Sequence, residues 1–388
     1  MKHVRLGIIG LGMGAMHARY LLEGKVRGAT LSAVCDALPE KTARYTKYPQ
    51  VQCFSDANAL IASDAVDAVL IATPHYAHTT LGIAALKRGL NVLVEKPISV
   101  HKADCEKLLA AHTNPKQIFG AMFNQRTDPF YRKIRAMVQK GELGEIQRIN
   151  WIITNWFRPE SYYRASPWRA TWAGEGGGVL MNQSTHNVDL FQWMFGMPSR
   201  VRAFAGFGKY HDIEVEDEVT AYFDYANGAT AVFVTSTGEA PGTNRLEVTG
   251  DRGRLVFEHD VLTFTRNVVS ASVFSRKSKE MYSAPATTTK TFAITGHGGQ
   301  HQEVTQNFVN AIRKGTPLIA PAADGIHAVE LANAMLLSAG TGKSVDLPMN
   351  AAAYARHLKQ LIARSRFVKP EATTPAIQNI ETSLSRSN

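Results

Sequence analysis

Residues 4–15 read Val-Arg-Leu-Gly-Ile-Ile-Gly-Leu-Gly-Met-Gly-Ala, an apolar run that ends in a glycine-rich turn. The β-branched run predicts a strand at 4–9, and the apolar spacing after the glycines predicts a helix at 15–22. This order of strand, GxGxxA turn and helix is typical of a dinucleotide site, because glycines let the backbone approach a pyrophosphate at the free N–H groups of a helix start. The expected cofactor contacts of the turn are Gly10, Gly12, Met13, Gly14 and Ala15.

Strands and helices continue to alternate up to about residue 123, which predicts right-handed βαβ units and a doubly wound parallel sheet. The further strands are expected at 31–34, 51–54, 65–72 and 91–94, and the further helices at 77–88 and 99–111, the second capped by Ser99. We therefore assign residues 1–124 to an α/β Rossmann domain that binds a dinucleotide.

After residue 124 the pattern changes to consecutive strand-like runs with short turns, which predicts a mostly antiparallel sheet. The strands are expected at 146–154, 201–207, 219–225, 230–237, 244–248, 254–257 and 261–264, and the helices at 129–140, 300–314 and 324–339. We assign residues 125–367 to an α+β domain that binds the substrate, with a loop or irregular strands at 269–299. Residues 368–388 are rich in Pro, Thr and Ser, which predicts a mobile tail.

The composition is that of a soluble globular protein, since the 388 residues are 45% apolar and 20% charged, enough for two domains. No apolar run reaches the roughly 20 residues of a membrane span. The run Leu6–Ile9 that follows Lys2 and Arg5 is too short for a signal peptide. Three scattered cysteines without a CxxC pair favour a reducing compartment, so we expect a cytoplasmic protein with no membrane partner.

The net charge of +10 comes from basic residues spread along the chain, and the densest stretches, 276–279 and 364–369, are short. In the absence of a nucleic-acid motif we expect a solvated basic surface and no nucleic-acid partner. The excess of positive charge favours anionic cofactors and substrates.

Asp36 follows the second expected strand and lies close to the roughly 20-residue spacing, counted from the glycine turn, of an acid that binds ribose. A carboxylate there accepts from the ribose hydroxyls and repels a 2′-phosphate, which favours NAD over NADP. Asp36 could instead cap the helix expected after Leu38, and the two roles are compatible. Lys41 and Arg44 lie nearby and keep NADP open.

Residues 90–97, Leu-Asn-Val-Leu-Val-Glu-Lys-Pro, place an acid and a lysine where a buried strand ends. Ligands of open parallel sheets bind at this edge. We expect Lys96 to donate to a substrate hydroxyl and to stabilise developing oxyanion character, with Glu95 beside the cofactor. The alternative is an ordinary solvated lysine, which is more common on a helix face.

A second strand end, at Thr73-Pro74, brings His75 and His78 to the same edge of the sheet. We assign all four residues to the cofactor site. The two histidines either line the nicotinamide or substrate pocket or simply begin the next helix.

Residues 176–190 begin with three glycines and continue Val-Leu-Met-Asn-Gln-Ser-Thr-His-Asn-Val-Asp-Leu, with helical apolar spacing from Val179 onward. The glycines could bring the backbone close to a ligand. On a helix, Asn182 and His186 share one face because they are four residues apart. We expect His186 to be a general base for a hydroxyl proton and Asn182 to bind the substrate; a buried structural histidine is the alternative.

His297 and His301 have the HxxxH spacing of some zinc sites, but the intervening glutamate and a third ligand are missing, so we expect no metal. Four tryptophans cluster around the expected domain junction, where aromatic rings stack on sugars or pack in the core. Trp168 is the candidate substrate contact among Trp151, Trp156, Trp168 and Trp172.

Taken in order, these motifs resemble those of the glucose-fructose oxidoreductase, inositol dehydrogenase and rhizopine catabolism (Gfo/Idh/MocA) family. The resemblance covers roughly residues 3–365 and is carried by the GxGxxA turn, Ala72-Thr73-Pro74 with His78, Glu95-Lys96-Pro97, and Gly176-Gly177-Gly178 with His186. It implies a second domain with a large open sheet that often mediates dimers or tetramers. It also implies oxidation or reduction of a secondary alcohol on a sugar, sugar derivative or cyclitol with NAD or NADP, with Lys96 on the reacting oxygen and His186 taking its proton.

Two departures from the family pattern matter. Relatives similar to inositol dehydrogenase have an aspartate where this chain has Asn182, which cannot exchange a proton, so inositol is disfavoured. The Asn-Gln pattern before the histidine looks more like branches that act at sugar C3, including nucleotide-sugar dehydrogenases. The family's Thr-Pro motif usually continues with asparagine, and here it continues with His75, which puts the usual hydrogen bond near the cofactor in doubt.

Three functions remain open. The leading expectation is an NAD-dependent sugar or cyclitol dehydrogenase, forming a homodimer or homotetramer. The second is redox-assisted cleavage of a glycoside, in which a tightly held NAD transiently oxidises the sugar. The third, a non-catalytic regulator that binds NAD or sugar, is disfavoured because Glu95-Lys96-Pro97 and His186 are all retained.

Overall fold

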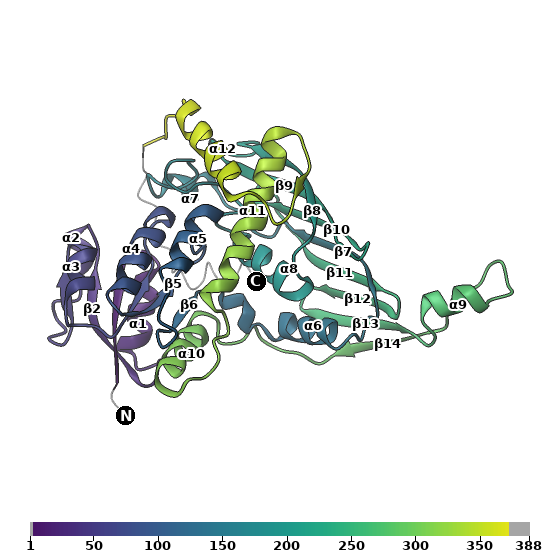
Figure 1. Cartoon of the computed structure of the whole chain (residues 1–388), viewed down its shortest axis with the longest axis horizontal. Coiled ribbons are helices and arrows are strands. Elements are labelled where there is room, and N and C mark those ends of the chain that lie inside the picture. The colour runs from purple at the N-terminus through teal and green to yellow at the C-terminus, as the bar shows by residue number, and fades with distance from the viewer. Residues whose placement is uncertain (1–2, 372–388) are drawn as a thin grey trace.

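Six parallel strands form the first of two sheets in a computed structural model that describes residues 3–371 (Figure 1). They run in the order β3-β2-β1-β4-β5-β6, so the order reverses between β1 and β4, where doubly wound sheets bind ligands. The strands are β1 Val4–Ile9, β2 Ala29–Cys35, β3 Gln52–Phe54, β4 Ala68–Ile71, β5 Asn91–Val94 and β6 Phe119–Ala121. The expected Rossmann architecture is confirmed.

The helices of this half alternate with its strands, as the sequence predicts. They are α1 Gly14–Leu22, α2 Pro39–Ala43, α3 Ala57–Ala62, α4 His75–Lys87 and α5 Lys102–Ala110. The prediction that Ser99 caps α5 is wrong. The cap is His101, whose side chain accepts from the Asp104 N–H, while the Ser99 hydroxyl contacts that of Thr79.

The second sheet has nine strands in the order β14-β13-β12-β11-β7-β10-β9-β8-β15. The strands pair antiparallel except for β7 and β10, which are parallel, so the expectation of a mostly antiparallel sheet is confirmed. Their bounds are β7 Ile146–Ile153, β8 Arg200–Phe207, β9 Glu216–Asp224, β10 Thr230–Ser236, β11 Asn244–Gly250, β12 Gly253–Glu258, β13 Val261–Asn267, β14 Thr287–Phe292 and β15 Val345–Asp346.

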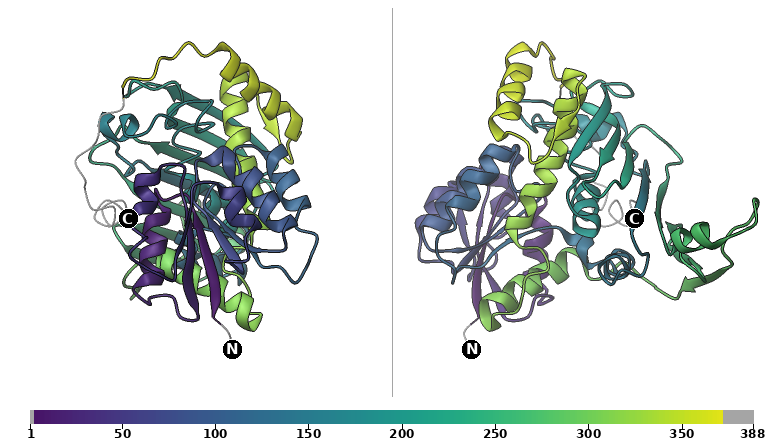
Figure 2. Two further views of the ribbon diagram at one scale, coloured as in Figure 1. Left: turned by 90° about the vertical axis from the view of Figure 1, so that its left-hand side faces the viewer. Right: turned by 45° about the vertical axis from the view of Figure 1, so that its right-hand side comes forward.

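The first domain and the remaining helices lie on one side of this sheet, except for α9, which lies beyond the sheet on a projecting arm (Figure 1 and Figure 2). Alternation along the strands buries Trp151 and Phe233 on that side and exposes Ile152, Phe204 and Tyr222 on the other. The helices are η1 Asn124–Thr127, α6 Pro129–Gln139, α7 Glu160–Arg164, α8 Thr185–Phe195, α9 Ala271–Lys277, α10 Gln300–Lys314, η2 Ala322–Asp324, α11 Gly325–Thr341 and α12 Ala351–Arg364.

Helix α10 returns to the first domain although it lies far along the chain. Its Val304 and Phe308 are buried in the same apolar cluster as Leu6 of β1 and Leu93 of β5. Helix α10 therefore covers one side of the first sheet and brings His301 against His17 of α1. Sequence periodicity predicts this helix but not its partner.

Three features of the second half differ from expectation or were not expected. The segment expected to be a loop or irregular strands contains α9, on an arm that projects from the body, and β14, which pairs with β13 (Figure 1). Helix α12 was not expected. The end of the predicted mobile tail, residues 372–388, lies outside the described residues.

Within residues 3–371 we find no helix with the length and apolar character needed to cross a bilayer.

Candidate active site

The three glycines of the first turn are each required for a different structural reason. Gly10 has a φ of +90°, and a Cβ there would lie 2.6 Å from the Ala72 carbonyl oxygen. A Cβ on Gly14 would lie 2.7 Å from Ile8 of β1, so this glycine lets α1 pack closely on the strand. A Cβ on Gly12 would meet nothing within 4 Å. Gly12 therefore leaves open space, as close approach of a pyrophosphate requires.

The start of α1 is suited to an anion. Its N-cap, Met13, makes no side-chain cap, and its first turn carries no acidic residue. Unsatisfied N–H groups and the positive end of the helix dipole therefore point at the space beside Gly12. This fits a dinucleotide diphosphate.

Asp36 stands at the end of β2 and contacts the glycine turn directly. Its carboxylate accepts from the Leu11 N–H at 2.7 Å and from the Leu38 N–H at 3.0 Å, and Lys41 Nζ lies 3.4 Å away. Asp36 does not cap α2, whose N-cap is Leu38 and which has no side-chain cap, but its carboxylate braces the glycine turn and the residue before the helix. Its contact with ribose stays a prediction.

The end of β4 presents Thr73, whose hydroxyl oxygen is buried and lacks a hydrogen-bond partner within the described chain. It adjoins the turn, because the Thr73 nitrogen would lie 2.8 Å from a Cβ on Gly10. An orphaned hydroxyl at this edge fits a cofactor that supplies the missing partner. Pro74 is exposed and caps α4.

His75 and His78 begin α4, and the protein's own backbone occupies ring nitrogens of both. His75 Nδ1 lies 3.1 Å from the Glu175 carbonyl, while His78 contacts the carbonyls of Pro97 and Thr73, each at 2.8 Å. Burial lowers the pKa of both imidazoles. Both histidines thus begin α4 and also hold the strand ends together, while their contact with a cofactor or substrate stays a prediction.

The side chain of Glu95 contacts helix α1 of the first domain. Its carboxylate lies 2.9 Å from His17 Nε2 of α1, and His17 packs edge-on against His301 of α10, with ring centroids 5.7 Å apart. Burial alone would raise the pKa of Glu95, but the hydrogen bond and charge of His17 lower it to about 2. The ionised carboxylate therefore fixes the backbone that carries Lys96. No motif in the sequence pointed to His17, and His301 was expected only as a possible metal ligand.

Lys96 is held by a single residue of the second domain. Its Nζ donates to the main-chain oxygen of Asn182 at 2.8 Å and lies 3.4 Å from the Asn182 Oδ1. Burial lowers the pKa of the ammonium to about 8, with Glu95 opposing the shift and Arg169 adding to it. Lys96 is therefore a charged donor at pH 7 whose proton is more easily given up than that of a solvated lysine.

His186 lies on α8, one turn after Asn182, but the prediction that one helix carries both is wrong. Helix α8 begins at Thr185, and Asn182 belongs to the turns that precede it. The Nδ1 of His186 is buried and has no hydrogen-bond partner within residues 3–371. Burial and then the charge of Lys96 lower the imidazole pKa well below its usual value. A neutral ring with an unused nitrogen beside a lysine can accept a hydroxyl proton.

The glycine run before these turns packs against the protein itself. A Cβ on Gly176, which has a φ of +82°, would lie 2.1 Å from Val100, and a Cβ on Gly178 would lie 2.0 Å from the Glu216 carbonyl. A glycine is required at both positions for close packing. The tight turns bring Asn182 to Lys96.

Glu175, which directly precedes the run, holds Asn182 in place and was missed. It accepts from the Asn182 amide and, at 2.6 Å, from the Ala170 N–H. The Asn182 amide also lies 3.3 Å from the hydroxyl of Tyr162. Asn182 thus positions Lys96, and its direct contact with a substrate stays a prediction. The sequence signal that could have pointed to Glu175 is an acid placed directly before three glycines.

Trp168 is half-buried beside the first residue of α4. Its ring meets His75 edge-on at 5.4 Å, and the Arg169 guanidinium lies 4.8 Å from its centroid. The two histidines of the HxxxH pair separate. His301 is buried near Glu95, while His297 Nδ1 lies 3.1 Å from Asp128, the N-cap of α6.

Two family models match this chain. The description "Oxidoreductase family, NAD-binding Rossmann fold" covers residues 4–123, and "GFO/IDH/MocA C-terminal domain" covers residues 131–256. Myo-inositol 2-dehydrogenase of Thermotoga maritima is 25% identical over 355 residues, covering 89% of this chain and 98% of the relative.

Solved structures have the same fold. The dehydrogenase WlbA of Bordetella pertussis, in complex with NADH and UDP-GlcNAcA, superposes with a TM-score of 0.75 at 22% identity, covering 90% of this chain and all of that one. Levoglucosan dehydrogenase in complex with NADH and L-sorbose gives a TM-score of 0.75 at 21% identity and the same coverage.

Proposed function

The chain belongs to the Gfo/Idh/MocA oxidoreductase family, and from that premise we propose that it transfers a hydride between NAD and a secondary alcohol or ketone of a sugar, sugar derivative or cyclitol. The observation that carries the proposal is the pairing, across two domains, of a buried lysine at a strand end with a neutral histidine whose Nδ1 is unused. The relatives named for inositol and levoglucosan support this substrate class.

The chain's own residues supply the proton chemistry. Lys96 donates to the reacting oxygen and stabilises the negative charge that develops there. His186 Nδ1 takes the hydroxyl proton, which its depressed pKa permits at neutral pH. When bound, NAD would supply the hydride acceptor for this oxidation. The glycine turn, the start of α1 and Thr73 would hold it, and we propose that Asp36 binds the ribose and selects NAD over NADP.

We also propose that the open face of the second sheet pairs with a second copy, as a homodimer or within a homotetramer. Phe204 and Tyr222 are 62% and 44% exposed on that face. A cytoplasmic location is proposed because Cys35, Cys53 and Cys105 are all free thiols.

The first experiment is to purify the protein without added nucleotide, denature it and identify any released cofactor. An empty protein that binds NAD reversibly is then assayed for NADH formation with a panel of sugars and cyclitols. NADH formation that requires Lys96 and His186 supports the proposal. NAD that survives dialysis and is never released during turnover would point instead to redox-assisted cleavage of a glycoside.

A further inference from the structure

Two guanidinium groups flank the ring of Tyr162 next to the proposed reaction centre. Arg169 lies 4.4 Å and Arg158 lies 5.3 Å from the ring centroid. The Tyr162 hydroxyl accepts from Arg169 at 2.6 Å and lies 3.3 Å from the amide of Asn182, the residue that holds Lys96. A short chain of contacts therefore joins both arginines to the proposed donor.

This arginine pair has little negative charge around it. Arg169 is 22% exposed and lies 3.9 Å from Glu175, whose carboxylate already receives an N–H and an amide. Within residues 3–371, no carboxylate lies within ion-pair distance of Arg158, whose Nη1 donates to a main-chain oxygen. Lys369 adds a further positive charge, since its Nζ donates to the Arg169 carbonyl. Of the four cations, Arg169 pairs with Glu175 and no carboxylate pairs with Arg158 in the described chain, while Glu95 and Glu214 act on Lys96 and Lys369.

The backbone that carries Arg158 is fixed in advance. Its N–H donates to the Thr237 carbonyl at 3.0 Å, and its carbonyl accepts from His211 Nε2 at 2.8 Å. The other ring nitrogen of His211 lies 3.0 Å from Asp217, which is fully buried. A guanidinium on an anchored backbone loses little entropy when it binds a ligand.

We propose that the sugar bound here carries an anionic group, a carboxylate or a phosphate, held by Arg158 and Arg169 on the side of the site where Asn182 meets Lys96. The planar donors of arginine match both anions in bidentate geometry, and a ligand anion would give a counterion to Arg158, which is partly buried and has no ion pair within residues 3–371. This inference rests on the proposed function and narrows its substrate class to sugar acids or sugar phosphates.

The test measures NADH formation by the full-length protein with matched neutral, acidic and phosphorylated forms of several sugars, for example D-glucose, D-glucuronate and D-glucose 6-phosphate. We expect at least one anionic form to exceed its neutral partner about tenfold or more in kcat/KM. Its advantage should shrink as ionic strength rises. The acidic and phosphorylated arms identify which anion is recognised.

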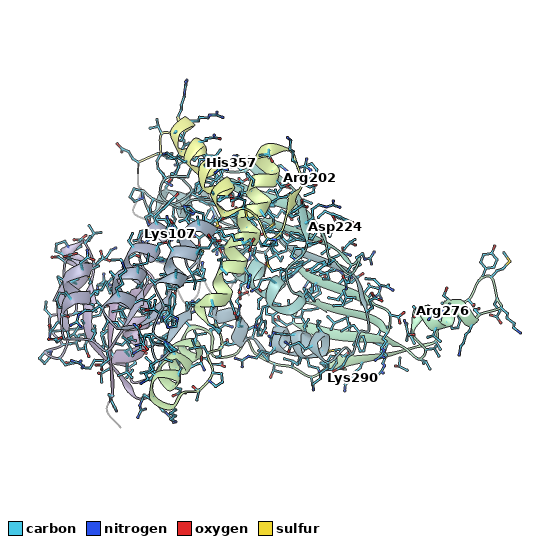
Figure 3. All side chains as sticks on the ribbon, in the orientation of Figure 1. Lys107, Arg202, Asp224, Arg276, Lys290 and His357 are labelled. Carbon is cyan, nitrogen blue, oxygen red and sulfur yellow. The ribbon has the colours of Figure 1, made fainter. Side chains whose placement is uncertain are left out.

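The variants Arg158→Gln and Arg169→Gln should each lower kcat/KM for the anionic sugar by about 10- to 100-fold, mainly through KM, and by clearly more than they lower it for the neutral sugar. The control is Arg276→Gln, on the projecting arm and far from the site (Figure 3), which should change neither. Equal use of neutral and anionic sugars, or equal losses for both in the two variants, would overturn the inference and show that the arginines only support the loop.

A binding measurement separates this inference from the proposed function. The NAD-loaded protein is titrated calorimetrically with the same anionic and neutral sugars. Anion binding that Arg169→Gln abolishes, without any NADH formation, would support the anionic site and overturn the dehydrogenase. If NADH formed from neutral sugars at the same rate in both arginine variants, the result would support the dehydrogenase and overturn the anionic site. No binding of any anionic sugar would also overturn it.

Discussion

The cofactor edge of the first sheet and the segment 155–186 hold their polar groups in opposite ways. At the cofactor edge, a glycine turn, a helix start and two strand ends position every candidate group through regular backbone, and Asp36 contacts Leu11 and Leu38 directly. In the segment 155–186, the short helix α7 carries Tyr162 and irregular turns carry Asn182, and side-chain hydrogen bonds hold both residues in place. Groups fixed by backbone belong to local motifs, whereas groups fixed by side chains depend on distant partners.

The largest expected effect lies in the second region. Replacing His186 with alanine removes the proposed proton acceptor, so kcat for sugar oxidation should fall by about 10³-fold, within the range measured for general bases. Steady-state NADH formation measures it. The control is His357→Ala on α12, which should leave kcat unchanged. A His186 variant with near-normal kcat would remove the histidine from the mechanism.

Lys96→Met tests the residue where the two regions meet. Loss of the donor to the developing oxyanion should lower kcat by about 10²-fold or more while leaving the Kd of NAD unchanged. Stopped-flow or steady-state assays measure kcat, and fluorescence titration with NADH measures the Kd of the cofactor. Lys107→Met, an exposed lysine on α5, is the matched control. Weakened NADH binding with normal turnover would assign Lys96 to the cofactor alone.

Gly10→Ala and Gly12→Ala separate fold from binding within the cofactor edge. Alanine at position 10 meets the Ala72 carbonyl at a φ of +90°, so it should lower the free energy of unfolding by about 1–3 kcal/mol. Alanine at position 12 meets no protein atom, so stability should persist while the Kd of NAD rises about tenfold. Urea unfolding and NADH titration measure both. Equal stability of the two variants would show that the turn shifts to accept a side chain at position 10, which would contradict the expected clash.

The pH dependence should reflect Lys96. Burial lowers its pKa to about 8, so the ammonium is present below that pH and lost above it. The rate of sugar oxidation should therefore fall about tenfold per pH unit above about 8 and stay flat from there down to neutral pH, where His186 is already neutral. A pH profile of kcat/KM measures this. A rate that keeps rising above pH 9 would mean that the neutral amine is the active form.

The smallest effect concerns the choice of cofactor. Asp36→Ser removes the carboxylate that would repel a 2′-phosphate, so the preference for NAD over NADP should fall several-fold, with Lys41 available to the added phosphate. The ratio of kcat/KM for the two cofactors measures it. Asp56→Ser, at the cap of α3, is the control. An unchanged ratio would mean that Asp36 only braces the glycine turn and the residue before α2.

The local motifs therefore predict much of the first region. Strand ends, glycines and Asp36 are readable because a βαβ unit places them by chain order alone, and the alternation of strands and helices up to residue 123 predicts the parallel sheet. In the second half the strand pattern predicts the sheet but not the parallel pairing of β7 with β10. Helical spacing from Val179 wrongly predicts a helix at Asn182, because apolar residues in buried turns imitate it.

The sequence by itself determined that a parallel sheet is followed by a mostly antiparallel sheet. It also determined the two residues proposed for the chemistry, Lys96 and His186, because each belongs to a motif whose spacing is fixed by the chain. Only the tertiary structure decided what surrounds them. Glu95 turns to His17, Glu175 holds Asn182, and Arg158 and Arg169 gather around Tyr162. These contacts join residues that are separated along the chain or lie in turns, and packing, rather than any local periodicity, brings their side chains together.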